Sequence, residues 1–231
     1  LLELEPDRFL SGFRSEAGLV PKAPKYEGWE SLGVAGQTLG HYMSACAMYY
    51  ATSGDERFLQ KLEYIINELD SCQQANGNGY LAATPGGKKI FAEVSAGNIY
   101  SQGFDLNGGW VPLYVMHKVL AGLIDAYQYA RSEQALRIAE KLADWMYGTF
   151  YPLTEDQMQK VLACEFGGMN EALANLYAYT KNDKFLLLAQ RFDNHKAIMD
   201  SLAIGVDDLE GKHANTQVPK MIGAARLYEL T

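Results

Sequence analysis

One short pattern occurs three times in this chain and limits the folds available to it. Each copy begins with Tyr, passes through polar residues and ends with Leu nine positions later. The copies are YATSGDERFL (50–59), YQYARSEQAL (127–136) and YAYTKNDKFL (177–186), and a fourth begins at Tyr228. After a longer first interval the repeat is about 50 residues long, a period typical of proteins that stack one structural unit.

The residues around each copy predict that the unit is a pair of helices. An apolar run rich in Ala, Leu and Met precedes each Tyr, at 40–50, 117–127, 170–177 and 218–228. An amphipathic run follows each complete copy, at 55–74, 133–147 and 182–192. The apolar runs are typical of inner helices and the amphipathic runs of outer helices. We expect Ser53, Ser132 and Asn182 to begin the outer helices as N-caps.

Alternating inner and outer helices predict an all-α fold, an α/α toroid of the (α/α)6-barrel type. Signals for β-strands are weak throughout the chain. The sequence supplies about four helical hairpins, fewer than a closed toroid of this type contains. We therefore expect residues 1–231 to form a single α/α-toroid catalytic domain that is truncated at both ends. Residues 76–110 are predicted to form a long Gly-rich loop, which its aromatic residues indicate is ordered.

Composition excludes some functions. The chain has 231 residues, with 20 basic and 28 acidic side chains and a net charge of −8. Without clustered Lys and Arg it is a poor candidate for binding nucleic acid. No apolar stretch reaches the roughly 18 residues of a membrane span. Cys46, Cys72 and Cys164 are far apart and have no zinc-binding spacing, so we expect buried free thiols.

Polar residues recur near the N-terminal ends of the predicted inner helices. His41, His117, Asn170, Glu171 and Asn215 all have this position, and so does Gln217. Parallel inner helices would gather these ends at one rim, where unpaired backbone N–H groups add donors. Each residue also has a simpler explanation, as a helix cap or a buried core group. The shared position, with carboxylates and aromatic rings nearby, favours a binding site for a sugar.

Five segments of the chain resemble a known family. They are LEPDRFLSGFRSEAGL (4–19), GWESLGVAGQTLGHYMSA (28–45), LNGGWVPLYVMHKVLAGLIDAY (106–127), EFGGMNEALANLYAYT (165–180) and DDLEGKHANTQVPKMIGAARLYELT (207–231). Together they resemble the bacterial β-L-arabinofuranosidase-like glycoside hydrolases of families 127 and 146, across essentially the whole chain. The resemblance implies an (α/α)6 barrel followed by β-sandwich domains. It also implies hydrolysis of terminal β-L-arabinofuranosyl residues with retention.

The resemblance extends to the residues expected to contact the sugar. We carry it to nine positions as substrate-binding residues: His41, Trp110, His117, Glu165, Asn170, Glu171, His213, Asn215 and Gln217. One position departs from the family pattern, because Gln37 replaces the first His of the usual GHTLGHY. An amide at that position still bonds to a hydroxyl group.

The family's cofactor and nucleophile are expected outside this chain. The resemblance implies a zinc-bound Cys as nucleophile and a Glu as general acid/base, with zinc holding the thiolate. In the family these residues follow the helix that begins at HANTQ, beyond Thr231. No metal ligand is assigned to this chain, its catalytic residues remain unassigned, and the 231 residues alone are expected to be inactive.

Two other functions remain open on the sequence. One is another (α/α)6 sugar enzyme, either an unsaturated uronyl hydrolase or an epimerase. The other is a non-catalytic helical-repeat binding protein. If the chain belongs to a sugar enzyme of either kind, its partner is a carbohydrate substrate. We expect no nucleic-acid partner and no membrane span. The sequence does not determine the oligomeric state. It is compatible with a bacterial protein in the cytoplasm, in the periplasm or outside the cell.

Overall fold

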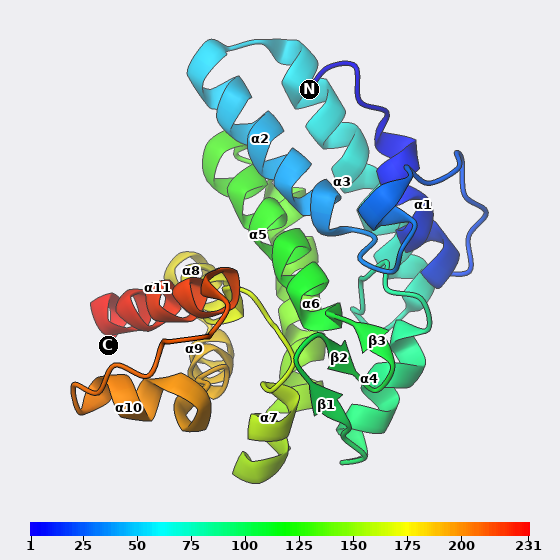
Figure 1. Cartoon of the computed structure of the whole chain (residues 1–231). Helices are drawn as coiled ribbons and strands as arrows, with labels where there is room; N and C mark the ends of the chain where they lie inside the picture. The colour runs from blue at the N-terminus through cyan, green and yellow to red at the C-terminus, as the bar shows by residue number, and fades with distance from the viewer.

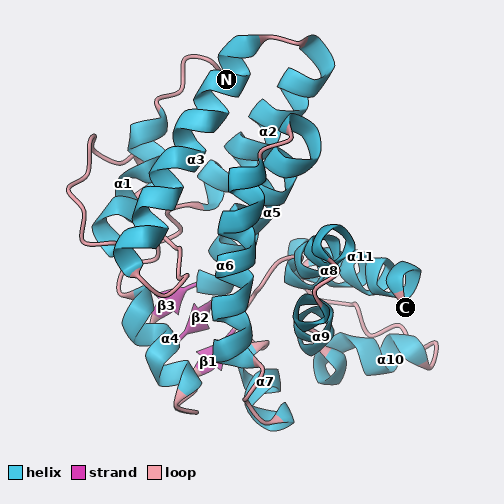
Figure 2. Cartoon of the chain, turned by 180° about the vertical axis from the view of Figure 1, so that it is seen from behind, coloured by secondary structure: helices cyan, strands magenta, loops and turns pink.

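The computed structural model describes residues 1–231 and confirms the predicted helical architecture. Four inner helices stand next to one another in chain order (Figure 1), and each packs against the next. They are α2 (Gln37–Ser53), α5 (Pro112–Ala130), α8 (Met169–Thr180) and α11 (Ala214–Leu230). The outer helices are α3 (Glu56–Asn76), α6 (Glu133–Phe150) and α9 (Asp183–Arg191). They also pack in order, and Figure 2 shows α3 beside α6. These layers form an all-α, toroid-like fold.

Shorter elements fill the ends of the hairpins. The remaining helical elements are α1 (Pro6–Glu16), the 3-10 turn η1 (Gly28–Glu30), α4 (Gly87–Ser95), α7 (Glu155–Val161), the π-helix η2 (His195–Met199) and α10 (Asp200–Ala203). Three two-residue strands form an antiparallel meander: β1 (Ser101–Gln102), β2 (Asp105–Leu106) and β3 (Gly109–Trp110). The prediction of a simple loop over 76–110 was therefore wrong, because this segment contains both α4 and the meander. No helix combines the length and the apolar character needed to cross a membrane.

The ten-residue repeat is the turn between an inner and an outer helix. In each copy the carbonyl of the Tyr accepts a hydrogen bond from the backbone N–H four residues later, at Gly54, Arg131 and Lys181. All three of these residues have left-handed backbone angles, with φ of 69°, 58° and 56°. Such a residue ends an α-helix and frees the chain to reverse. The repeat therefore encodes a tight helical hairpin.

The next position in each copy begins the outer helix. Ser132 and Asn182 accept hydrogen bonds from the backbone of the first helical turn, which confirms two of the three predicted N-caps. The third prediction was wrong: Ser53 is the last residue of α2, and Asp55 caps α3 by accepting from the Arg57 N–H. Asp55 lies five residues after its Tyr, as Ser132 and Asn182 do. The repeat position thus identifies the cap more reliably than the residue type.

Helices α2 and α5 approach so closely that only glycine fits at their contact. A Cβ atom added to Gly40 would overlap the backbone carbonyl of Lys118, and one added to Gly122 would lie 2.6 Å from the Gly40 carbonyl oxygen. Small residues at a helix crossing allow the two backbones to approach closely. This contact fixes the N-terminal half of α2 against the middle of α5.

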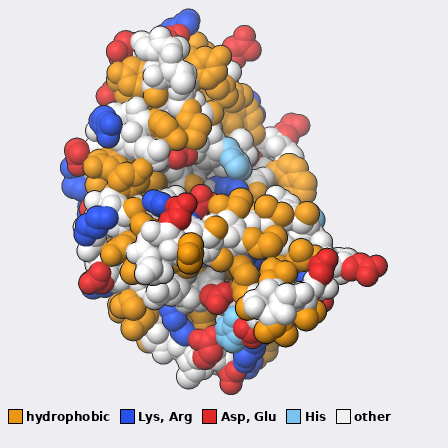
Figure 3. Space-filling view, turned by 90° about the vertical axis from the view of Figure 1, so that its left-hand side faces the viewer, with side chains coloured by type: hydrophobic (Ala, Val, Ile, Leu, Met, Phe, Trp, Pro, Cys, Tyr) orange, Lys and Arg blue, Asp and Glu red, His pale blue; other side chains and the backbone are white.

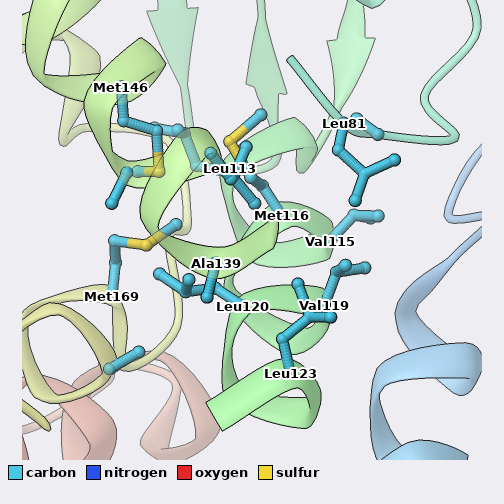
Figure 4. Packing of buried hydrophobic residues seen from close by; sticks show 14 of the residues in the cluster. Leu81, Leu113, Val115, Met116, Val119, Leu120, Leu123, Ala139, Met146 and Met169 are labelled. Carbon is cyan, nitrogen blue, oxygen red and sulfur yellow. The ribbon is translucent and has the colours of Figure 1, made fainter. Parts of the chain in front are cut away.

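The core follows the helical layers. One cluster of buried side chains connects α1, the hairpins and the meander, and Figure 4 shows its centre around Leu113, Met116 and Leu120 of α5. Ala139 and Met146 of α6 contribute from the outer layer. Helix α5 is buried along most of its length because it lies between the other inner helices and α6. The core therefore holds fixed the helix whose N-terminal end adjoins the meander.

A charged histidine clasp joins three elements on the surface. His195 Nε2 lies 3.0 Å from Glu155 Oε1 at the start of α7, and Nδ1 lies 3.1 Å from Asp200 Oδ2 in α10. The hydrogen bond to Asp200, followed by that to Glu155, raises the pKa of His195 above its usual value. Protonated His195 therefore stabilises the folded chain.

We expect Gly40→Ala to destabilise the protein by about 2–4 kcal/mol, because the added methyl group forces α2 and α5 apart. Gly148→Ala is the matched control, since Gly148 lies in α6 with open space around it. Alanine there should stabilise the protein by roughly 0.5–1 kcal/mol through helix propensity. Urea unfolding of both variants provides the measurement, and equal effects of the two substitutions would contradict the proposed close contact.

We expect stability to depend on the charge of His195. Because the folded pKa is raised above the ordinary value of 6.5, the stabilisation is fully present below pH 6.5. It is lost as pH rises through the raised pKa. The effect should stay below about 1 kcal/mol, since the clasp is partly exposed and screened. His195→Gln should lose stability at pH 5.5 and little at pH 8.5, as measured by urea unfolding. An equal loss at both pH values would exclude the clasp.

Candidate functional site

The candidate site is a pocket at the N-terminal ends of the inner helices α2, α5 and α11. It encloses about 280 Å³. Its lining comes from η1, the meander and the helix ends: Trp29, Val34, Gln37, Phe104, Trp110, Val111, Tyr114, Glu165, His213 and Asn215. Ligand pockets are commonly apolar concavities with a few placed polar groups. This pocket fits that description, and we call it the aromatic pocket.

Two pairs of rings form the walls of the aromatic pocket. Trp29 and Trp110 lie with ring centroids 5.4 Å apart, and Phe104 and His213 lie 6.1 Å apart in an edge-to-face arrangement. These rings come from four separate segments: η1, β3, the turn between β1 and β2, and the residue that precedes α11. The pocket therefore depends on the tertiary fold and on no single motif.

A strained residue adjoins one of the walls. Val111 has φ 40° and ψ 48°, a left-handed conformation that is unusual for a β-branched side chain. Its N–H donates to the Phe104 carbonyl, and the following Pro112 begins α5. Beyond this turn Trp110 lies beside Gly33, where an added Cβ atom would be 3.7 Å from the indole ring. Strain of this kind costs about 1–3 kcal/mol and is concentrated at functional sites.

Glu165 supplies the charged group of the pocket. Its residue is 5% exposed, and no hydrogen bond or ion pair within the protein ends on its carboxylate. Its backbone is fixed, because its N–H donates to the Gly103 carbonyl in the meander. Unpaired buried carboxylates are costly unless a ligand or a nearby charge compensates them. Burial lowers the pKa values of the nearby Lys118 and Lys220, that of Lys220 to about 8, and the Glu165 charge opposes this shift at both lysines.

Gln37 enters the pocket from the first residue of α2, and a buried carboxylate fixes that helix end. Glu30 is 4% exposed and accepts hydrogen bonds from the N–H groups of Gly36 and Thr38, at 2.9 and 3.3 Å. The donors that we expected α2 to offer a ligand are therefore already partly used. The amide of Gln37 presents the polar atoms at this end instead.

A second group of polar side chains, which includes His41, His117 and Glu171, lies outside the aromatic pocket, between α2, α5 and α8. His117 is buried and its Nδ1 accepts a hydrogen bond from the Gly168 N–H at 3.3 Å, so the neutral ring carries its proton on Nε2. Burial, with the charges of Lys118 and His41, lowers the pKa of His117 to about 3. Partial burial and Lys118 also lower the pKa of His41. Burial raises the pKa of Glu171, and Asp125 contributes.

One face of the molecule is hollowed. Figure 3 shows a depression between the upper and lower halves of the molecule, bordered by a histidine, basic and acidic side chains. Asn170 does not point into a free space: its amide donates to the Lys220 carbonyl at 3.0 Å, and its Oδ1 accepts from the Glu171 N–H. Gly223 leaves room for the Asn170 side chain between α8 and α11. Asn170 therefore joins two inner helices.

Gln217, the last of the predicted residues, is bound by Lys220. The lysine Nζ donates to Gln217 Oε1 at 3.1 Å and to Asn194 Oδ1 at 3.0 Å, and it lies over the Phe166 ring. Lys220 is 3% exposed. The side-chain oxygen of Gln217 accepts the bond from Lys220, and the amide N–H groups of Gln217 have no partner within the protein.

The structure thus divides the nine predicted residues. Trp110, Glu165, His213 and Asn215 line the aromatic pocket, whereas His41, His117, Asn170, Glu171 and Gln217 lie outside its lining. Sugar binding by any of the nine stays a prediction. Sequence reasoning did not assign Trp29, Val34, Phe104, Val111 or Tyr114 to the site. The aromatic residues of the loops gave the available signal, but nothing local placed them at one pocket.

The residues of the chain do not form a zinc–thiolate centre. No group of three His, Cys, Asp or Glu side chains could hold a metal ion. Cys46, Cys72 and Cys164 are buried and free. Burial raises the pKa of Cys72 to about 11 and that of Cys164 to about 12.

Comparison with known proteins connects this fold to carbohydrate chemistry. Residues 1–231 match the family described as β-L-arabinofuranosidase, GH127 catalytic domain. The solved structures that the fold resembles include a GH127 β-L-arabinofuranosidase from Geobacillus stearothermophilus T6, at 19% sequence identity and a TM-score of 0.58. The match covers 93% of this chain and 32% of that chain, so this chain spans about a third of that relative's length. A search of curated proteins gives no match.

We expect Asn170→Ala to destabilise the protein by about 1–3 kcal/mol, because the buried carbonyl of Lys220 loses its donor. Asn215→Ala is the matched control: Asn215 is exposed at the pocket, so its loss should change stability by less than about 0.5 kcal/mol. Thermal and urea unfolding of both variants test this difference. Equal stability of the two variants would show that Asn170 does not hold α8 to α11.

Proposed function

Because this chain belongs to the family of GH127 β-L-arabinofuranosidase catalytic domains, we propose that it binds the sugar in a glycoside hydrolase of that type. The family match over residues 1–231 is the observation that carries this proposal. The substrate is a carbohydrate with a terminal β-L-arabinofuranosyl residue. The solved relative that shares the fold is itself a GH127 β-L-arabinofuranosidase.

The chemistry of the aromatic pocket supports this function. A sugar presents hydroxyl groups around its edge and C–H groups on its faces, so it needs both polar partners and apolar walls. Glu165 accepts hydrogen bonds from hydroxyl groups, and Gln37 and Asn215 both donate and accept them. Trp29 and Trp110 offer flat apolar surfaces. Few other small ligands require this combination without a balancing cation in the lining.

The proposed reaction is hydrolysis with retention at a zinc-bound Cys nucleophile. Since the three thiols of this chain are buried and lack partner ligands, we propose that the nucleophile and the zinc ligands are supplied by polypeptide outside residues 1–231. The contribution of this chain is then to bind and orient the sugar. Within the aromatic pocket, the Glu165 carboxylate accepts hydrogen bonds from the hydroxyl groups of the sugar.

Activity assays test this division of roles. Residues 1–231 should bind methyl β-L-arabinofuranoside without releasing nitrophenolate from 4-nitrophenyl β-L-arabinofuranoside. Turnover by these residues alone would contradict a nucleophile outside the chain. In a polypeptide that does turn over, a metal chelator should abolish activity. Chelator-resistant hydrolysis, or preference for an unsaturated uronide, would favour a different (α/α)6 enzyme.

We expect Glu165→Gln to weaken binding of methyl β-L-arabinofuranoside roughly ten- to a hundredfold, since hydrogen bonds to a charged group contribute about 1.5–3 kcal/mol. Isothermal titration calorimetry measures the affinity. Glu63→Gln provides the control, because Glu63 is exposed on the outer helix α3. If both variants bind the glycoside as tightly as the unchanged protein, Glu165 is not part of the sugar site.

A further inference from the structure

The open end of the aromatic pocket carries unusually exposed rings. Trp29 is 60% exposed, Phe104 50% and Trp110 37%, although large aromatic side chains are ordinarily well covered. All three line the same pocket, together with His213. We call these four residues the ring slot. A cluster of exposed apolar groups at one cavity is typical of a binding surface.

The ring slot is held in shape before any ligand arrives. Trp110 precedes the left-handed Val111 and adjoins Gly33, as described above. Trp29 belongs to η1, and so does the residue after it, Glu30. Two hydrogen bonds anchor Glu30 to the start of α2. Phe104 lies in the meander, where its carbonyl is bonded to the Val111 N–H. These contacts fix the backbone positions from which the rings project, which reduces the ordering needed on binding.

The slot and the polar groups occupy different depths. Glu165 is almost completely buried, whereas the rings of Trp29 and Phe104 reach solvent. A terminal sugar whose hydroxyl groups bond to Glu165 therefore directs the rest of its molecule outward, past the rings. That remainder is the group released when the glycosidic bond breaks.

We propose that the ring slot binds the leaving group of the substrate by stacking against a neutral ring. This inference rests on the proposed function, because it takes the terminal sugar to lie beside Glu165. Two kinds of leaving group share the required chemistry: a second sugar, through its C–H face, and an aromatic aglycone. A negatively charged leaving group is disfavoured, because Glu165 is the one carboxylate of the lining and no Lys or Arg accompanies it there.

Three ligands separate the contribution of the terminal sugar to affinity from that of a second ring. Methyl β-L-arabinofuranoside has no second ring, a β-L-arabinofuranosyl disaccharide has a sugar ring, and phenyl β-L-arabinofuranoside has an aromatic ring. Affinities are measured by isothermal titration calorimetry. We expect at least one of the two ringed ligands to bind about three- to tenfold more tightly than the methyl glycoside, as aromatic contacts contribute roughly 0.5–1.5 kcal/mol. The disaccharide and the phenyl glycoside identify which ring the slot prefers.

Trp29→Ala should abolish the advantage of the ringed ligand, so that the ringed ligand and the methyl glycoside bind this variant with affinities within about twofold of each other. Trp145→Phe is the matched control, because Trp145 packs against Tyr80 and Phe91, away from the pocket. The chain has three tryptophans, so ligand-induced quenching of fluorescence should persist in Trp145→Phe. Circular dichroism and thermal unfolding establish that each variant is folded.

A failure of the ring-slot proposal can be distinguished from a failure of the proposed function. If the methyl glycoside binds and neither second ring adds affinity, the ring slot is refuted and the proposed function stands. If no β-L-arabinofuranoside binds, the proposed function fails. The slot is then tested with phenyl glycosides of other sugars: a loss of affinity in Trp29→Ala supports it, and equal affinity of the variant and the unchanged protein overturns it.

Discussion

The close contact between α2 and α5 determines where the functional groups of this chain lie. Gly40 and Gly122 allow the two backbones to touch, and no larger residue fits at either position. The contact brings the N-terminal end of α2, with η1 before it, beside the N-terminal end of α5, with the meander before it. Trp29 and Trp110 are therefore neighbours although some 80 residues separate them in the sequence.

Much of the fold was predictable because its main signals are local and repeated. Each copy of the turn ends an inner helix with a left-handed residue and begins the outer helix at the next position. Hydrophobic period distinguished the two layers. The misassigned Ser53 shows the limit of reasoning by residue type, since Asp55, two residues later, is the N-cap. The meander escaped prediction because two-residue strands have no detectable alternation.

The site was only partly predictable, for a physical reason. Of the polar residues that the sequence argument placed at the N-terminal ends of inner helices, Asn215 lines the pocket. Trp110, Glu165 and His213, which came from the family resemblance, line it too. It could not separate residues that face the pocket from those that join helices. Asn170 bonds to the Lys220 carbonyl, and that partner is visible only when α8 and α11 are packed. Periodicity indicates which face of a helix is buried, but it does not indicate which groups of a neighbouring helix that face meets.

The lysines nearest to Glu165 leave its carboxylate oxygens unpaired. Lys118 and Lys220 lie near Glu165, but the structure records no ion pair between Glu165 and either lysine. Lys220 Nζ instead donates to Asn194 and Gln217. A direct ion pair would use the oxygens of Glu165, whereas lysines that bond elsewhere leave those oxygens free to accept hydrogen bonds. The arrangement of Lys220, Asn194 and Gln217 therefore keeps the Glu165 carboxylate open to the pocket.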